Sequence, residues 1–570
     1  MFSNLKNLWR RRTRKRLTPI DPDEIFIDSQ NLPDFDTHQF EGRLEKPISY
    51  NVYKTVMFFV VIVGGVFLYR LWGLQVVEGQ DFRMRSDSNN LHNTLIFADR
   101  GVVFDRNKVP LVWNTVNPEG SDFSLREYAT STGLSTTLGY VKYPSKDSSG
   151  IYYQEKFDPK DGIEKIYNSE LSGRDGLKII ETDVKGKVVS ESVVQAPQDG
   201  SNLDMSIDLQ LQKRLYSSII DVANRGGFKG GSGVIMNVET GEIISLANFP
   251  EYDSQILSDG NNAEKINGWI KSTNNPFLNR AVDGLYTPGS IMKVFVAMGV
   301  LEEDVIDPAK QILSTGSITV PNPFFPDKPS VFVDWKAHGL VDLRRALAVS
   351  SNVYFYEVSG GFKGQKGIGI ENIEKYSRLF GFGSTTGIYF PGEKNGTIPS
   401  PTWKKLTFKG EDWRVGDTYN TSIGQYGFQV SPVQVVRAFG GIATNGTLVT
   451  PTFMKVTVPE QIKKEVIGAE LESDSFRIVK EGMRMCVTAG TCQAINYSNL
   501  EVAAKTGTAQ IGANKDEVNS WVAGFWPYKN PKYAFVIVME RASRGNQFGA
   551  VLVMKEFFDW VNIYTPEYLQ

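Results

Sequence analysis

The pattern of apolar and polar positions first separates one long apolar run from the rest of the chain. Residues 55–69 carry no charge and lie between Lys54 and Arg70. This run is shorter than the ~20 residues that cross a bilayer as a helix, but apolar positions continue to Val77 and the flanking cations can reach the membrane surface. We therefore predict a single transmembrane helix over residues 52–77.

A buried core helix and a cleaved signal peptide are the alternatives for this run. A leader of about fifty residues is too long for a signal peptide, and no small-residue cleavage site is present. The first 16 residues carry 7 Lys or Arg side chains and no acid. Because positive charge favours the cytoplasmic side, we expect residues 1–51 to be a cytoplasmic tail and the chain after residue 77 to lie outside the cytoplasmic membrane.

Beyond residue 201 the pattern changes to short apolar runs between turns, mixed with helical spacing. Asp208 is placed to cap a helix over 208–223, and a turn at 239–241 divides two apolar runs into a hairpin. Further strands are predicted at 503–509, 521–526 and 533–539, and a helix at 550–563. The fold class that this favours is α+β, with a five-stranded antiparallel sheet covered by helices.

The amino-acid composition excludes several kinds of chemistry but says little about the fold. The 570 residues have a net charge of −2, which excludes the basic footprint of a nucleic-acid-binding protein. The 3 His are far apart and the 2 Cys cannot form a thiolate zinc site alone, so a nucleophile would find its base elsewhere. Cys486 and Cys492 would lie on the exported side, where either a disulfide or two buried thiols fits.

A Ser-x-x-Lys motif opens an almost wholly apolar segment. Ser290 and Lys293 are followed by residues 294–301, which have the composition of a buried helix. Positions three apart share one helix face, so the two side chains would meet there. Desolvation lowers the pKa of a lysine, and a neutral Lys293 could take the proton of Ser290. This motif also occurs by chance, so its meaning depends on the rest of the chain.

Two further short motifs follow. Ser350 and Asn352 lie at a predicted helix-to-loop junction, where a hydroxyl and a carboxamide can relay a proton and hold a substrate amide. Residues 505–508 (Lys-Thr-Gly-Thr) lie on a predicted strand, where an ammonium and hydroxyls offer donors to a carboxylate and glycine admits a substrate backbone. The alternatives are a helix cap for the first motif and an exposed edge-strand turn for the second.

In this order, the three motifs resemble the active-site set of the serine penicillin-binding protein and β-lactamase superfamily. Segments 286–290, 417–425 and 430–434 are similar to class B penicillin-binding proteins. Gly416 to Thr418, and the glutamine after Lys-Thr-Gly-Thr-Ala, resemble the penicillin-binding protein 2 branch, the elongation-type transpeptidases. The resemblance implies a pedestal of the dimerisation type over 78–201 and a transpeptidase domain over 202–570.

The resemblance also implies an activity, namely a peptidoglycan D,D-transpeptidase that cross-links stem peptides during cell elongation and is inhibited covalently by β-lactams. Ser290 would form the acyl-enzyme, Lys293 would be the general base, Ser350 a proton relay and Asn352 a holder of Lys293 or of the substrate amide. The substrate carboxylate would be received by a set on the strand: Lys505, Thr506, Gly507 and Thr508. No metal or cofactor is implied, and a polytopic membrane glycan polymerase of the shape, elongation, division and sporulation family is the implied partner.

Some alternatives and one departure stay open. The family usually has Gly-Gln-Gly where this chain has Gly424, Gln425 and Tyr426, which leaves the conformation of that loop undetermined. A division-type transpeptidase, a membrane-anchored β-lactam sensor and a hydrolase are the alternative functions. The class A β-lactamase pattern Glu-x-x-Leu-Asn is absent, sensors usually have more spans, and a glycosyltransferase domain does not fit before Asn202.

Overall fold

The computed structural model describes residues 49–570 apart from 119–121, 149–151, 183–187, 323–324 and 513. Most of the predicted cytoplasmic tail, residues 1–48, therefore lies outside the described residues. The chain divides into two units, residues 1–90 and 91–570, which are described separately.

The first unit contains the apolar run. Helix α1 (Tyr50–Trp72) continues through a π-helical turn, Gly73–Val77, and is followed by α2 (Gly79–Asn90). The stretch Tyr50–Val77 has 28 residues with a mean hydropathy of 2.0 in its most apolar window, which is long and apolar enough to cross a membrane.

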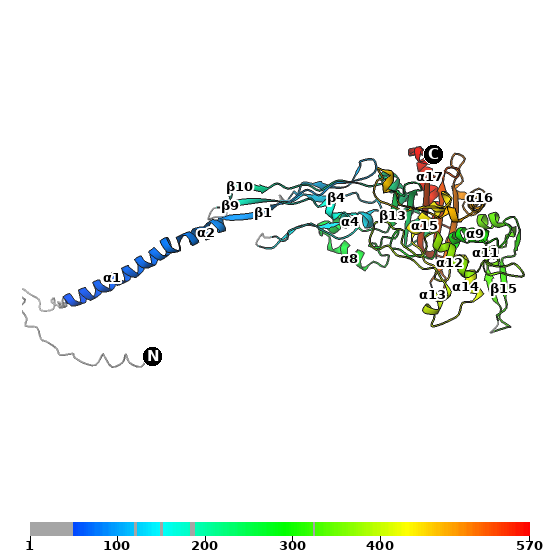
Figure 1. The fold of residues 1–570 in the computed structure, drawn as a ribbon, viewed down its shortest axis with the longest axis horizontal. Coiled ribbons are helices and arrows are strands. Elements are labelled where there is room, and N and C mark those ends of the chain that lie inside the picture. Colours follow the sequence, from blue (N-terminus) through cyan, green and yellow to red (C-terminus); the bar gives the residue numbers. More distant parts are fainter. Residues whose placement is uncertain (1–48, 119–121, 149–151, 183–187, 323–324, 513) are drawn as a thin grey trace, which may run out of the picture. The chain divides into compact units, whose positions relative to one another are not determined.

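The second unit begins with small sheets rather than a large one (Figure 1). One antiparallel sheet has the order β1 (Leu91–Ile96), β9 (Gly176–Thr182), β10 (Val188–Gln195). Another has the order β11 (Leu203–Asp204), β2 (Val103–Phe104), β3 (Pro110–Thr115), β4 (Leu125–Tyr128). Because β11 pairs with β2 in parallel, the chain at residue 203 still belongs to a sheet of the preceding segment.

Short helices and two-stranded pairs complete this first part of the unit. The helices are α3 (Ser135–Leu138), α4 (Gly162–Ile166) and α5 (Asn168–Leu171). The pairs are β5 (Val141–Lys142) with β8 (Asp158–Pro159), and β6 (Ser145–Lys146) with β7 (Tyr152–Gln154).

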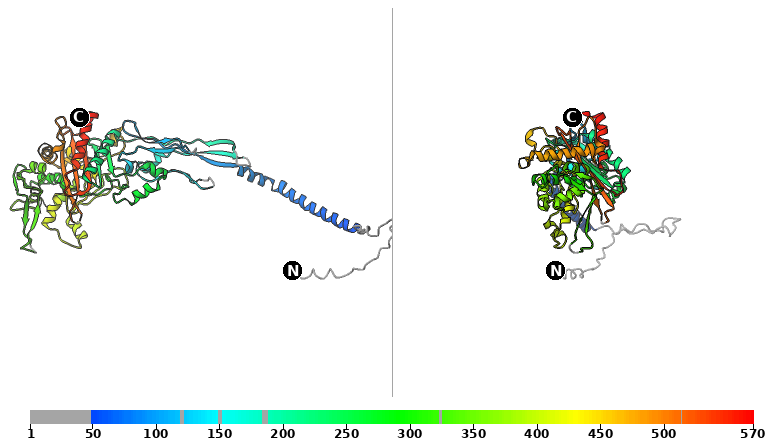
Figure 2. Two further views of the ribbon diagram at one scale, coloured as in Figure 1. Left: turned by 180° about the vertical axis from the view of Figure 1, so that it is seen from behind. Right: turned by 90° about the vertical axis from the view of Figure 1, so that its right-hand side faces the viewer.

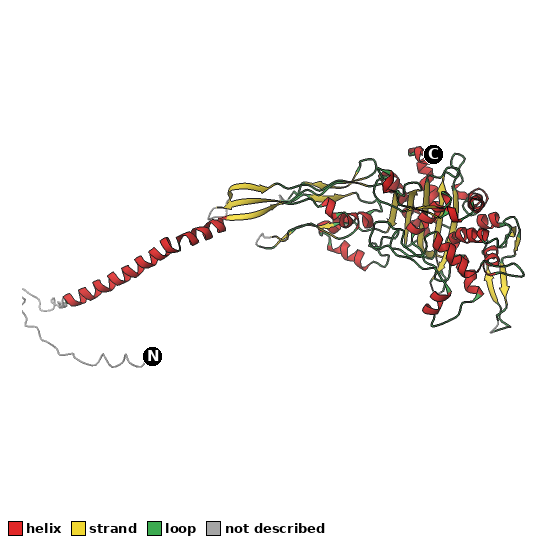
Figure 3. Cartoon of the chain, viewed as in Figure 1, coloured by secondary structure: helices red, strands yellow, loops and turns green. Residues whose placement is uncertain are grey.

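The larger part of the unit is built on a five-stranded antiparallel sheet with helices on both faces (Figure 3). Its strand order is β13 (Ile243–Phe249), β12 (Gly230–Asn237), β22 (Tyr533–Ser543), β21 (Glu517–Trp526), β20 (Ala503–Ile511). In β12, Val234 packs into one core and Ile235 into the other, so both faces of the strand are buried. Burial of both faces explains why successive residues of this strand, 234–236, are all apolar.

Helices α6 (Leu209–Gly226) and α17 (Ala550–Tyr564) cover one face of the sheet, and α17 is the red helix near the C-terminus in Figure 2. The side chain of Asp208 caps α6, as predicted, by accepting from the N–H groups of Gln210 and Leu211. Helix α15 (Pro432–Ala443) covers the other face, and α16 (Ser473–Ala489) packs against the edge strand β20.

The remaining helices and strand pairs of this part have the following bounds. The helices are α7 (Ser254–Asp259), α8 (Ala263–Lys271), α9 (Lys293–Glu302), α10 (Leu343–Val349), α11 (Asn352–Gly360), α12 (Gly369–Leu379), α13 (Pro401–Thr407) and α14 (Val415–Ser422), together with the 3₁₀ turn η3 (Gly289–Met292). The strand pairs are β14 (Ile312–Ser314) with β17 (Gly339–Val341), β15 (Ser317–Val320) with β16 (Ser330–Val333), and β18 (Thr447–Val449) with β19 (Lys464–Val466).

Candidate active site

Ser290 lies in η3, a turn that packs directly against the edge strand of the sheet. Gly289 has a φ of +60°, and a Cβ at this position would lie 2.8 Å from the carbonyl oxygen of Thr508, so only glycine fits. The N–H of Gly289 donates to the carbonyl of Gly424 at 3.0 Å. The turn is thereby held between β20 and the loop that follows α14.

The expectation that Ser290 and Lys293 lie on one face of an α-helix is wrong for the turn that contains Ser290. The structure has η3 and then an α-helix that begins at Lys293. The left-handed backbone of Gly289 prevents an α-helical start. Since residues i and i+3 eclipse each other in a 3₁₀ turn, Ser290 and Lys293 still lie on one side.

The amine of Lys293 is completely buried and is held by the second motif. Its Nζ donates to the carbonyl oxygen of Ser350 at 2.8 Å and to Oδ1 of Asn352 at 2.7 Å, and it lies 3.4 Å from Oγ of Ser350. Burial lowers the pKa of Lys293 to about 7, although the carboxylate of Asp334 acts in the opposite direction. A substantial fraction of this amine is therefore neutral near pH 7, as a general base requires.

Ser350 and Asn352 lie at a junction between two helices, not at the predicted helix-to-loop junction. Ser350 follows the last residue of α10 and has a left-handed φ of +58°. Ser351 caps α11 by accepting from the N–H of Tyr354. A new helix begins immediately because this cap is present, which directs Ser350 and Asn352 toward Lys293.

The third motif lies on β20, and its side chains alternate as the strand pattern predicts. Lys505 and Gly507 are buried, whereas Thr506 is half-buried and Thr508 is exposed. Desolvation, and then the charge of Lys293, lower the pKa of Lys505 well below its ordinary value. Among the described residues the Nζ of Lys505 donates only to the carbonyl of Thr506, at 3.0 Å. A bound carboxylate would favour the ammonium form of Lys505 and supply its counter-charge.

The side chain of Thr506 faces the end of α16. Its Oγ1 lies 2.5 Å from Oγ1 of Thr491. Thr491 lies between Cys486 and Cys492 in the sequence. These two cysteines form a disulfide in the structure, whereas the sequence fitted either a disulfide or two buried thiols. The sequence gives no signal for Thr491, because its contact depends on how α16 packs against β20.

The loop with the unusual tyrosine has a defined conformation. Gly424, Tyr426 and Gly427 all have left-handed φ angles, of +72°, +62° and +83°. The ring of Tyr426 packs with three other aromatic rings at centroid distances of 5.7, 6.1 and 5.8 Å, those of Trp403, Phe408 and Trp413. This packing compensates for a backbone conformation that usually requires glycine.

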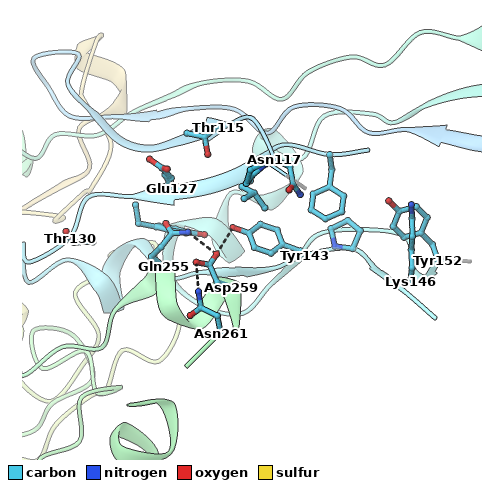
Figure 4. Close-up of a pocket in the computed structure, with 15 residues that line it drawn as sticks. Thr115, Asn117, Glu127, Thr130, Tyr143, Lys146, Tyr152, Gln255, Asp259 and Asn261 are labelled. Atoms are coloured by element: carbon cyan, nitrogen blue, oxygen red, sulfur yellow. Dashed lines mark hydrogen bonds between the residues drawn. The ribbon is translucent and has the colours of Figure 1, made fainter. Parts of the chain in front are cut away.

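A pocket of about 820 Å³ lies elsewhere in the second unit, lined by residues within 115–152 of its first part and by residues within 255–261 (Figure 4). Its lining includes Phe123, Tyr143 and Asp259, and the hydroxyl of Tyr143 lies 3.4 Å from the Asp259 carboxylate. None of the eight predicted site residues lines this pocket, so it is separate from the cluster around Lys293.

The comparisons with known proteins agree with this geometry. Residues 231–558 match the family model of the penicillin binding protein transpeptidase domain, and residues 121–205 match that of the penicillin-binding protein dimerisation domain. Peptidoglycan D,D-transpeptidase MrdA of Haemophilus influenzae is 29% identical over 475 residues, which cover 78% of this chain and 70% of the relative. The protein of the same name from Escherichia coli is 25% identical over 605 residues, covering 88% and 92%.

Solved structures with a similar fold also include penicillin-binding proteins. A complex of penicillin-binding protein 2 with MreC from Helicobacter pylori has a TM-score of 0.65 at 26% identity and covers 83% of this chain and 98% of that chain. Penicillin-binding protein 2 of Pseudomonas aeruginosa in complex with WCK 5153 has a TM-score of 0.66 at 26% identity, covering 82% and 97%.

Ser290 and the buried Lys293 lie at the edge of a helix-covered antiparallel sheet, an arrangement that fits a serine acyltransferase. Since the transpeptidase model matches more than half of the chain, the chain belongs to the penicillin-binding protein transpeptidase family. Together with the dimerisation model and the relatives, this makes it a class B protein of the penicillin-binding protein 2 type. Its apolar helix, Tyr50–Val77, fits the membrane anchor of such a protein.

Proposed function

We propose that this protein is a peptidoglycan D,D-transpeptidase that cross-links stem peptides during cell elongation. The observation that carries the proposal is the buried amine of Lys293, which Ser350 and Asn352 hold on the same side of the turn as Ser290. The relatives named peptidoglycan D,D-transpeptidase support the substrate class.

In the acylation step, Oγ of Ser290 attacks the carbonyl carbon of the penultimate D-Ala of a donor stem. Neutral Lys293 accepts the serine proton, and Ser350 relays a proton to the departing amine of the terminal D-Ala. The new ester bond joins Ser290 to the stem as the D-Ala–D-Ala peptide bond breaks. Asn352 keeps Lys293 in place through its Oδ1.

The edge strand receives the donor. Lys505, Thr506 and Thr508 bind the terminal carboxylate, while Gly507 lets the substrate backbone approach. The N–H groups of Ser290 and Thr508 stabilise the oxyanion. The close approach of Gly289 to Thr508 supports this role, because it brings the two backbone segments together.

In the second step, an amine of a neighbouring stem attacks the ester carbonyl. Its proton passes to Lys293, the Ser290 oxygen leaves and regains a proton, and the new amide is the cross-link. A β-lactam acylates the same serine, but the opening of its ring expels no leaving group. The whole inhibitor stays attached to Ser290 and blocks the enzyme covalently.

We also propose the placement of the chain in the cell. The N-terminal tail, residues 1–51, lies in the cytoplasm, residues 52–77 cross the cytoplasmic membrane, and a pedestal over 78–201 carries the transpeptidase domain over 202–570. The partner is a polytopic glycan polymerase of the shape, elongation, division and sporulation family, whose product supplies the uncross-linked stems.

The test is the reaction itself, measured with the full-length protein and glycan strands that carry pentapeptide stems. We expect cross-linked muropeptides and one D-Ala released per cross-link, and neither product from Ser290→Ala. Release of D-Ala without cross-links would identify a hydrolase and contradict the proposal. Cross-linking by Ser290→Ala would also contradict it.

A further inference from the structure

We infer that Asp334 is a positioning residue that holds the Ser350–Asn352 turn against Lys293. This inference rests on the proposed function. Asp334 belongs to no motif in the sequence, and it lies in the segment that follows β16. We call residues 333–335, Val333, Asp334 and Trp335, the strap.

The carboxylate of Asp334 bonds to the start of α11 in more than one way. One of its oxygens accepts from the Oγ of Ser351 at 2.9 Å and from the N–H of Val353 at 2.9 Å. The same oxygen lies 3.4 Å from the hydroxyl of Ser314. Since the side chain of Ser351 already caps α11, an ordinary helix cap does not account for this second set of bonds.

The strap also orients the amide of Asn352. The Nδ2 of Asn352 donates to the carbonyl of Val333 at 3.3 Å, and its Oδ1 accepts from Lys293. An amide has a donor end and an acceptor end. Because Val333 binds the donor end, the acceptor end faces the amine; a reversed amide would present a donor to a donor.

Trp335 holds the other end of the turn. Its Nε1 donates to the carbonyl of Val349, the residue just before Ser350, at 3.2 Å. The strap therefore binds the turn at Val349, Ser351, Asn352 and Val353, on both sides of Ser350.

Asp334 also acts on Lys293 through its charge. Three charged or titratable groups face this amine or its surroundings: Asp334, Lys505 and His338. The Nε2 of His338 is buried and lies 3.6 Å from the other oxygen of Asp334. Asp334 is the group among these whose charge favours the ammonium form of Lys293.

The test compares Asp334→Asn with the wild type, using the full-length protein in detergent and the rate of acylation by a fluorescent penicillin between pH 5 and 9. We expect the plateau rate to fall by about tenfold to a hundredfold, because the turn loses its anchor. We also expect the acidic limb of the profile to move to lower pH, because Lys293 loses the charge that raises its pKa. A general folding defect would instead lower the fraction of the protein that is acylated, without moving this limb.

The matched control is Asp342→Asn. Asp342 caps α10 by accepting from the N–H of Arg345 at 2.8 Å but does not contact the turn. We expect a wild-type profile from this variant. An unchanged profile of Asp334→Asn, or the same changes in both variants, would overturn the inference. Failure of the wild type to be acylated would instead contradict the proposed function.

A second variant covers the case in which Asp334→Asn does not fold. Trp335→Phe keeps an aromatic ring but removes the bond to Val349. We expect a several-fold lower plateau rate with an unmoved acidic limb, since no charge is lost. A wild-type rate in this variant would then overturn the inference.

Discussion

At the scale of single residues, the site depends on two lysines that are both buried. Lys293 keeps partners that fix its position, whereas Lys505 lacks a carboxylate partner among the described residues. Burial and mutual repulsion favour the neutral form of a lysine. In the proposed mechanism, Lys293 can therefore accept a proton and Lys505 can bind a carboxylate.

The pKa of about 7 for Lys293 predicts a pH dependence of acylation. The base must be neutral, so the acylation rate should fall as the pH drops through about 7 and reach a plateau above it. Lys293→Arg should lose at least ~100-fold at every pH, because a guanidinium stays charged. Stopped-flow measurement with a chromogenic cephalosporin would check both points. A rate that is constant from pH 5 to 9 would be incompatible with Lys293 as the base.

The positions of Lys293 and Lys505 in the site were predictable from the sequence, because each lysine lies within a short local motif. Asp334 was not, because it lies 16 positions before Ser350 and touches the turn only after the β15–β16 pair has folded back. Tyr426 shows the same limit. The sequence shows that glycine is replaced, but not that Trp403, Phe408 and Trp413 pack around the ring that replaces it.

At the scale of elements, local patterns predicted the strands and helices of the large sheet, since each has its own periodicity and cap. The small sheets of the preceding segment have no such signal. Their strands are short, and their most buried polar contact joins residues far apart in the sequence. Glu164 lies between Arg100 and Arg126, at 2.5 Å and 2.7 Å, with all three side chains buried.

Glu164→Gln should therefore destabilise this segment by roughly 3–5 kcal/mol, because two buried guanidinium groups lose their counter-charge. Burial alone would raise the pKa of Glu164, but Arg126 and Arg100 hold it below its ordinary value. The stabilisation is accordingly complete above the ordinary range of a glutamate and is lost as the pH falls through the lowered folded-state pKa.

Thermal unfolding of the full-length protein between pH 7 and pH 3 would check this prediction. The control is Asp204→Asn, which removes an exposed ion pair with Lys108 and should change stability by less than ~1 kcal/mol. Equal effects of the two substitutions at pH 7 would contradict the role given to Glu164.

At the scale of the whole molecule, the chain combines an apolar helix with a unit that holds both the small sheets and the catalytic sheet. The strand β11 pairs with β2, so the catalytic part starts from a sheet of the preceding segment. The amino-acid composition of the whole chain gave little indication of this organisation. The 3 His are consistent with the proposed use of lysine as the base, and the net charge of −2 conceals a strongly basic start.

The central claim is that Ser290 forms the acyl-enzyme. The most direct measurement is to incubate the full-length protein with a fluorescent penicillin and to locate the adduct by mass spectrometry of its peptides. We predict one stable adduct per chain, on the peptide that contains Ser290, and no label on Ser290→Ala. An adduct on a different residue, or undiminished labelling of Ser290→Ala, would contradict the account.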